Sequence, residues 1–154
     1  MSTDLNDLRG EIKDAVALYQ TPIVYDDILF DKIVLKAVKQ YYIDTGKVNL
    51  FNSQYVTGAM PTLTIDLNLV EREYIIIWGQ IIFIDQIRAD VSQLVSLTSD
   101  AMNLTNMDKP YKNLSEDRKN LTDRLIELFY KLPNVSTMTP VINISIPKLN
   151  VTYE

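Results

Sequence analysis

The sequence predicts a mainly α-helical protein, a four-helix bundle around one long central helix, with a short β element and a β-forming C-terminal arm. Three observations predict it. Apolar residues recur at three- and four-residue steps in four segments, which is the spacing of a buried helix face. One of these segments, residues 74–84, is apolar on nearly all sides. Residues 142–153 instead alternate between apolar and polar side chains, which is typical of strands.

The first helix is expected over residues 5–19. Charged side chains occupy the opposite face, so the helix is amphipathic with one buried stripe. Thr3 or Asp4 can cap its start. The pair Thr21-Pro22 ends it, because proline disfavours the helical conformation of the residue before it. The predicted buried stripe consists of Leu5, Leu8, Ile12, Val16 and Tyr19.

The second helix is expected from Asp26 to Tyr42. Asp26 or Asp27 supplies the N-cap, where a negative charge suits the helix dipole. Gly46 closes the helix, since glycine adopts a left-handed conformation at little cost. Three lysines lie opposite a wide apolar stripe that consists of Leu29, Phe30, Ile33, Val34, Ala37, Val38, Tyr41 and Tyr42.

Residues 47–66 permit two interpretations. Leu63, Ile65 and Leu67 alternate with polar residues, and Thr57-Gly58 resembles a turn, so a two-stranded hairpin is possible. An ordered loop with partial strand character fits slightly better. This region is the predicted short β element.

The third helix is expected from Asp66 or Asn68 to Leu97. Asn68 followed by Glu71 resembles a capping box. The helix is roughly 45 Å long at ~1.5 Å per residue. Its first half is apolar nearly all round and is therefore central, and Gly79 could kink it. The apolar run is about half of the ~20 residues that cross a bilayer, so a buried helix is preferred to a membrane span.

A polar connector is expected over residues 98–113, followed by a fourth helix over 114–132. Asn113 or Ser115 caps this helix, and Pro133 ends it. Its apolar stripe consists of Leu121, Leu125, Leu128, Phe129 and Leu132. The chain therefore divides into a helical domain, 1–132, and an extended arm, 133–154.

The arm carries two short strand signals separated by Pro147. One alternative is that it adds to the sheet edge of another chain. The other is that it packs on the 47–66 region of its own chain, and the sequence gives both equal weight.

Composition excludes several classes of chemistry. The 154 residues contain no Cys and no His, which removes thiolate nucleophiles, Cys/His zinc sites and histidine acid–base catalysis. The net charge of −5 argues against a dedicated binder of the nucleic-acid backbone. The first residues lack a basic and apolar leader pattern, so no signal peptide is expected.

The remaining candidates for chemistry are weak. Four carboxylates on the third helix could ligate a metal, but salt-bridged or solvated positions are preferred for Glu71, Glu73, Asp85 and Asp90. Asp85 is expected to pair with Arg88 or with a neighbouring subunit. The connector does not have the central glycine and closing glutamate of a calcium loop. A basic cluster, for which a solvated helix start is the default, consists of Lys109, Lys112, Arg118 and Lys119.

Trp78, the sole tryptophan, is expected to anchor the core rather than to stack on a ligand. No catalytic residue, cofactor-binding residue, metal ligand or cofactor is predicted, and the chain is not expected to be an enzyme.

Three segments carry a resemblance to a known family: LNLVEREYIIIWGQ at 67–80, DVS at 90–92 and TSDAMNLTNMDKPY at 98–111. They resemble small head–tail connector proteins, also called adaptor or neck proteins, of tailed bacteriophages. The likeness covers residues 5–132 in helix order and is most specific in 66–114. The 133–154 extension departs from the compact helical pattern of that family.

The resemblance implies a structural virion protein at the neck, made in the cytoplasm of a bacterial host. It implies a homo-oligomeric ring of about a dozen copies under the portal protein, joined to other neck or tail proteins. DNA would pass through the ring without sequence-specific binding, and no membrane is involved. The proposed interface residues are Asp100, Asn103, Asn106, Lys109, Tyr111, Ile142, Ile144, Ile146, Val151 and Tyr153.

Two other functions remain open. The first is a small helical protein-binding or regulatory module. The second, less favoured, is an enzyme that uses carboxylates alone.

Overall fold

The computed structural model describes residues 3–17, 19, 25–47, 51, 53–56, 59–98 and 105–133, with the helical backbone alone for 91–98 and 105–113. These residues form four helices, α1 (Leu5–Val16), α2 (Asp27–Thr45), α3 (Leu69–Thr98) and α4 (Thr105–Phe129). The prediction of a mainly helical bundle is confirmed.

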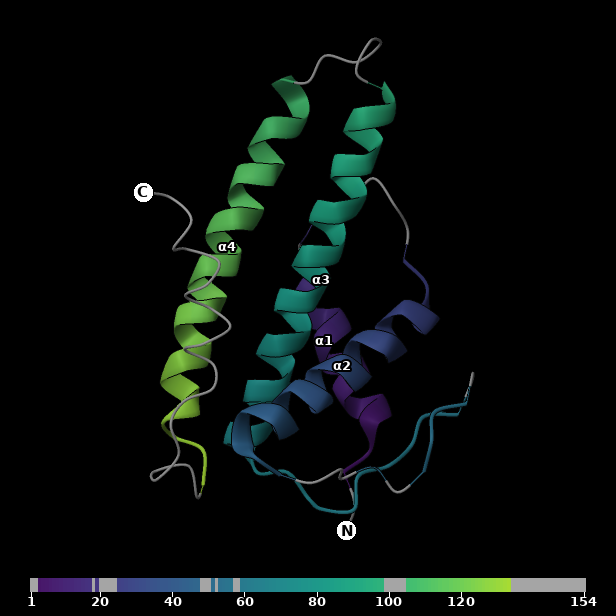
Figure 1. The fold of residues 1–154 in the computed structure, drawn as a ribbon, viewed down its shortest axis with the longest axis vertical. Helices are drawn as coiled ribbons and strands as arrows, with labels where there is room; N and C mark the ends of the chain where they lie inside the picture. Colours follow the sequence, from purple (N-terminus) through teal and green to yellow (C-terminus); the bar gives the residue numbers. More distant parts are fainter. Residues whose placement is uncertain are drawn as a thin grey trace.

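Helix α3 is the centre of the bundle, as predicted. It packs against α1, α2 and α4, and α1 also packs against α2. Figure 1 shows α3 and α4 side by side along the long axis, with α1 and α2 crossing the N-terminal half of α3. All α3 side chains from Val70 to Ile84 are buried or half-buried. The apolar surface of this part of the helix is therefore largely covered by its own chain.

In the part of the chain that the structure describes, none of the helices is long and apolar enough to cross a membrane.

Both ends of α2 and the start of α1 follow the local signals in the sequence. The Asp4 carboxylate accepts a hydrogen bond from the Asn6 amide at 2.8 Å, and the Asp26 carboxylate accepts one from the Leu29 amide at 2.9 Å. Gly46 has φ 66°, in the left-handed region, as expected for a helix C-cap.

Helix α1 is shorter than predicted. It ends at Val16, where the backbone hydrogen bonds change from residues four apart to residues three apart. The Ala17 amide donates to the Asp14 carbonyl, and the Tyr19 amide donates to the Val16 carbonyl. Tyr19 therefore lies outside the helix, although it still packs against the core.

The capping box at the start of α3 is confirmed. The Glu71 amide donates to Asn68 Oδ1 at 2.9 Å, and the Asn68 amide donates to Glu71 Oε2 at 2.8 Å. The reciprocal pair satisfies two backbone donors that would otherwise have no helical partner.

Gly79 has a packing role. A Cβ atom at Gly79 would lie 2.5 Å from Ile12 Cδ1 and 2.9 Å from Ile12 Cγ1. Ile12 is fully buried. The missing side chain therefore lets α1 approach the backbone of α3 closely.

The predicted connector over residues 98–113 is wrong in its second part. Helix α4 begins at Thr105, about two and a half turns before the predicted start at Leu114. Met107, Tyr111 and Leu114 have helical spacing, which the polar residues between them obscured. Pro110 is the sixth residue of α4 and cannot donate to the carbonyl of residue 106, so the second turn of the helix lacks one backbone hydrogen bond.

The predicted β element is not confirmed. Within the described residues, the 47–66 region contains isolated bridges only, Phe51 with Leu63 and Val56 with Ala59, and Asp4 pairs with Thr62. The interpretation as an ordered loop fits this better than a hairpin. The C-terminal arm predicted over 133–154 lies outside the described residues after position 133.

Candidate functional site

A buried polar cluster joins the end of α2 to the first turns of α3. Asp44 is fully buried and accepts three hydrogen bonds. Tyr74 Oη donates to Asp44 Oδ2 at 2.6 Å, Trp78 Nε1 donates to the same oxygen at 3.0 Å, and Gln40 Nε2 donates to Oδ1 at 2.8 Å. Tyr74 and Trp78 are four residues apart, so one face of α3 presents both donors to α2.

The second carboxylate of this cluster is Glu71, which is also buried. Tyr41 Oη donates to Glu71 Oε1 at 2.7 Å, and Lys47 Nζ lies 3.3 Å from the same oxygen. Lys47 also lies 5.2 Å from the centre of the Tyr41 ring. The rings of Tyr41 and Tyr74 meet edge to face at 6.1 Å, so the two carboxylate groups belong to one cluster.

Burial controls the protonation of this cluster. Desolvation raises the pKa of Asp44 above its ordinary value, although the hydrogen bonds from Tyr74, Gln40 and Trp78 act in the opposite direction. Desolvation also raises the pKa of Tyr41, which Glu71 raises further, and that of Tyr74, which Asp44 raises further. Both phenols stay protonated and act as hydrogen-bond donors.

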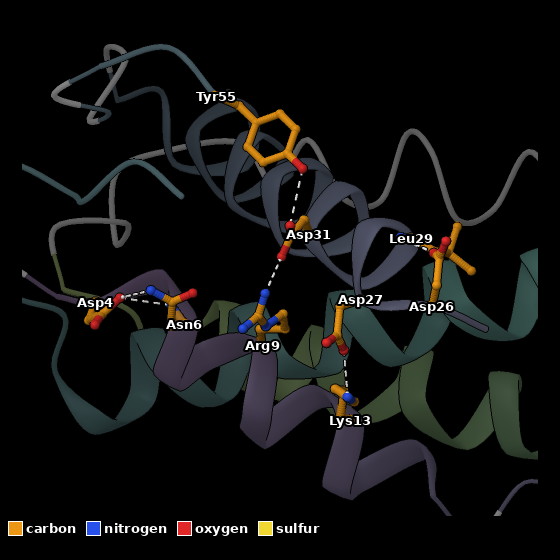
Figure 2. A network of polar contacts seen from close by, with 9 residues as sticks. All are labelled: Asp4, Asn6, Arg9, Lys13, Asp26, Asp27, Leu29, Asp31 and Tyr55. Atoms are coloured by element: carbon orange, nitrogen blue, oxygen red, sulfur yellow. Dashed lines mark hydrogen bonds and ion pairs between the residues drawn. The ribbon is translucent and has the colours of Figure 1, made fainter. Parts of the chain in front are cut away.

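Polar contacts between α1 and α2 are drawn in Figure 2. Arg9 Nη1 donates to the buried Asp31 at 2.7 Å, and Tyr55 Oη donates to the other oxygen of Asp31 at 3.1 Å. Lys13 pairs with Asp27 at 2.6 Å and lowers the pKa of that exposed carboxylate. These contacts hold α1 and the loop residue Tyr55 to opposite sides of one α2 side chain (Figure 2).

The outward carboxylates of α3 pair with cations on neighbouring helices. Asp85 accepts two hydrogen bonds from Arg118 of α4, at 2.7 and 3.2 Å. Glu73 accepts one from Arg124 of α4 at 3.0 Å. On another side of α3, Arg72 pairs with Glu11 of α1.

The expected pairing of Asp85 with Arg88 or with a second subunit is therefore corrected. The partner is Arg118 of the same chain, because α4 lies beside this turn of α3. Asp90, the last of the four candidate metal carboxylates, accepts a hydrogen bond from Tyr25 Oη at 2.8 Å. No group of three metal-binding side chains occurs within the described ranges.

Trp78 is half-buried and packs against the core, which fits its expected role as an anchor. Its indole nitrogen donates inward to Asp44.

A pocket of about 210 Å³ lies between α2 and the loop that follows it. Its lining is mixed, with one lysine and several apolar side chains, namely Leu35, Lys39, Phe51, Ser53, Gln54, Tyr55 and Pro61. Among the described lining residues, the groups that can ionise or donate a proton are Lys39 and the hydroxyl groups of Ser53 and Tyr55.

The predicted interface residues do not form one described group. Asn106, Lys109 and Tyr111 lie in the first two turns of α4 rather than in a connector. Asp100 and Asn103 fall outside the described residues. The same holds for the residues predicted on the arm, Ile142, Ile144, Ile146, Val151 and Tyr153.

The sequence analysis missed the buried carboxylates Asp31 and Asp44. A signal was present, because Asp31 and Asp44 are three residues from the apolar positions Val34 and Tyr41, on one side of α2. A carboxylate in an apolar stripe indicates a buried partner.

Comparison of this chain with family models, with curated proteins and with solved structures found no match.

Proposed function

We propose that this chain is a structural subunit of a bacteriophage neck. In this proposal it assembles as a ring between the portal and the tail and surrounds the DNA passage. The proposal is supported by the sequence resemblance of segments within residues 67–111, by the order of the helices, and by a central helix that serves as a scaffold.

The observation that carries the proposal is that the carboxylates on α3 bond to other parts of the fold. Glu71, Glu73, Asp85 and Asp90 each bond to a side chain of another part of the fold. Carboxylates used in this way hold helices together, as a load-transmitting subunit requires. An enzyme would instead need acid and base groups directed into a cleft.

The charge of the chain agrees with a passive DNA passage. At a net charge of −5 the chain repels phosphate on average, so DNA could pass without being retained.

Electron microscopy provides the direct test. The purified chain is imaged alone and after mixing with the portal protein encoded in the same genome. We expect ring-shaped particles, or an added layer on the portal. A chain that neither forms rings nor binds the portal would contradict the proposal.

A second candidate function is a protein-binding module, and the pocket beside Lys39 favours it. The pocket is lined by apolar side chains and by Lys39, a combination that suits a short acidic peptide segment. Light scattering separates the two candidates, since a module stays monomeric and binds its partner at a simple ratio, whereas a ring subunit gains mass in steps of its own chain.

A further inference from the structure

The outward face of α2 has an unusual composition. We call it the lysine face; it consists of Ile28, Lys32, Lys36, Lys39 and Ile43. These five positions follow steps of three and four residues, so they lie along one side of the helix. The two isoleucines are 43% and 59% exposed. The face therefore has a cationic centre between two exposed apolar ends.

The three lysines differ from the cations at the helix contacts. Arg9, Lys47, Arg118 and other cations between helices each pair with a carboxylate. Within the described part of the chain, no ion pair involves the lysines of the lysine face. No carboxylate occupies an exposed position of α2 between the two isoleucines. Their positive charge is thus not balanced locally, although the whole chain is acidic.

The outward face of α1 has the opposite charge. We call it the aspartate face; it consists of Asp7, Gly10 and Asp14 together with the C-cap residue Ala17, all exposed. No ion pair of the described residues involves either aspartate. A Cβ atom at Gly10 would meet nothing within 4 Å. An exposed helical glycine lowers helix stability relative to alanine, and no neighbour among the described residues requires a glycine at this position.

The two faces match each other in charge, spacing and shape. Lys32 and Lys39 are seven residues apart, as are Asp7 and Asp14, which is roughly 10 Å on each helix at ~1.5 Å per residue. Gly10 lies between the aspartates and leaves room for long lysine side chains to lie close to the α1 backbone.

We infer that the lysine face of α2 in one copy docks against the aspartate face of α1 in a second copy. This inference rests on the proposed assembly function and names its contact surface. The contact joins two different faces, so it is heterologous and forms a ring where the rotation between copies closes. Surface ion pairs contribute little individually. Burial of the two isoleucines therefore supplies the attraction, and the charges set the register.

A nucleic acid is a poorer occupant of the lysine face. Only three lysines are available, and the rest of an acidic chain repels phosphate. The aspartate face of a second copy carries charges with the same spacing as those of the lysine face. A phosphate backbone is uniformly charged, so its binding would not require that spacing.

A charge exchange tests the inference in the full chain. Variant A carries Lys32→Glu and Lys36→Glu, and variant B carries Asp7→Lys and Asp14→Lys. Sedimentation velocity measures self-association as a function of protein and salt concentration. We expect each variant alone to associate at least tenfold more weakly than the native chain. An equimolar mixture should recover association, because each variant then meets a face of opposite charge.

Two control variants change the net charge equally on α4 and on the residues directly after it. Lys119→Glu with Lys131→Glu matches variant A, and Glu116→Lys with Asp123→Lys matches variant B. All four positions are exposed and outside both faces, so association should stay within twofold of the native value. A neutral variant, Gly10→Gln, tests the close approach: it should weaken association tenfold while the thermal midpoint stays at or above the native value.

The outcomes separate the inference from the proposed function. Rings that persist in variants A and B would overturn the inference and leave the neck function standing. Charge-sensitive association without rings or portal binding would support the inference and overturn the neck function. If the native chain stays monomeric at low salt and also fails to assemble on the portal, both the inference and the neck function are overturned. Binding of duplex DNA that variant A abolishes would assign the lysine face to nucleic acid and overturn the inference.

Discussion

At the scale of single residues, the interior of this protein depends on hydrogen bonds between tyrosines and carboxylates. Tyr25 bonds to Asp90, Tyr41 to Glu71, Tyr55 to Asp31 and Tyr74 to Asp44. A phenol that stays protonated can donate to a carboxylate at any physiological pH. This arrangement lets a chain without histidine place carboxylates between its helices.

Asp44 provides a residue-scale prediction about pH. Because burial raises the pKa of Asp44, the folded state binds its proton more tightly than the unfolded state. The contribution of Asp44 to the free energy of unfolding therefore falls as the pH rises above the ordinary pKa of an aspartate. Asp44→Asn removes the charge and keeps an acceptor for Tyr74 and Trp78. We expect the stability of Asp44→Asn relative to the native chain to rise between about pH 4 and pH 7.

Urea unfolding at both pH values measures this difference, with Asp44→Ala as the comparison. The alanine variant leaves the Tyr74 and Trp78 donors without an acceptor and should lose about 2–4 kcal/mol. If the asparagine variant were as unstable as the alanine variant, the charge would be essential and the prediction wrong.

The glycines give a second residue-scale prediction, with a matched control. Gly79→Ala should destabilise the protein by about 1–2 kcal/mol, because its Cβ meets the buried Ile12. Gly10→Ala should stabilise it by up to about 1 kcal/mol, because the same change meets open space. Thermal unfolding of both variants checks the signs.

A double variant identifies the cause. Ile12→Val removes Cδ1, the atom nearest to the added methyl group, so it should cost less in the Gly79→Ala background than in the native chain. Equal costs in both backgrounds would show that Ile12 is not the obstacle.

At the scale of elements, capping and ion pairs place each helix. Asp4, Asp26 and Asn68 cap the starts of α1, α2 and α3. Ion pairs from α3 to α4 and from α1 to α2 then fix how the helices lie against one another. The caps were predictable because they depend on residues close in sequence, whereas the ion-pair partners were not.

The cap of α3 gives an element-scale prediction. Asn68→Ala removes the acceptor of the Glu71 amide and should lower the free energy of unfolding by about 1 kcal/mol. Asn120→Ala, at an exposed interior position of α4, is the control and should change stability by less than about 0.5 kcal/mol. Urea unfolding of the two variants compares them directly. A loss of equal size in both would remove the specific role of the cap.

At the scale of the whole molecule, the helices of one chain cover the apolar half of the central helix. The apolar half of α3 was expected to be central, and α1, α2 and α4 surround it. Among the described residues, the surfaces available for assembly are therefore outward faces of helices.

Deletion of residues 134–154 is the whole-molecule prediction. The buried core reaches Leu132, so the truncated chain should keep its helical circular dichroism and a thermal midpoint close to the native value. If the arm joins one component to the next, the truncated chain should fail to join portal and tail particles in a reconstitution assay. Joining at the native level would contradict the role of the arm, and loss of helical signal would show that the arm belongs to the core.

The sequence alone determined the number and order of the helices, the approximate limits of α2 and α3, the capping box at Asn68 and the left-handed Gly46, because periodicity and capping are local properties. It also excluded cysteine and histidine chemistry. Only the tertiary structure decided that Asp44 receives Tyr74 and Trp78, that Asp85 pairs with Arg118, and that Gly79 accommodates Ile12. The partners in these contacts are 30 or more residues apart. Their meeting depends on how whole helices pack, which no short stretch of sequence specifies.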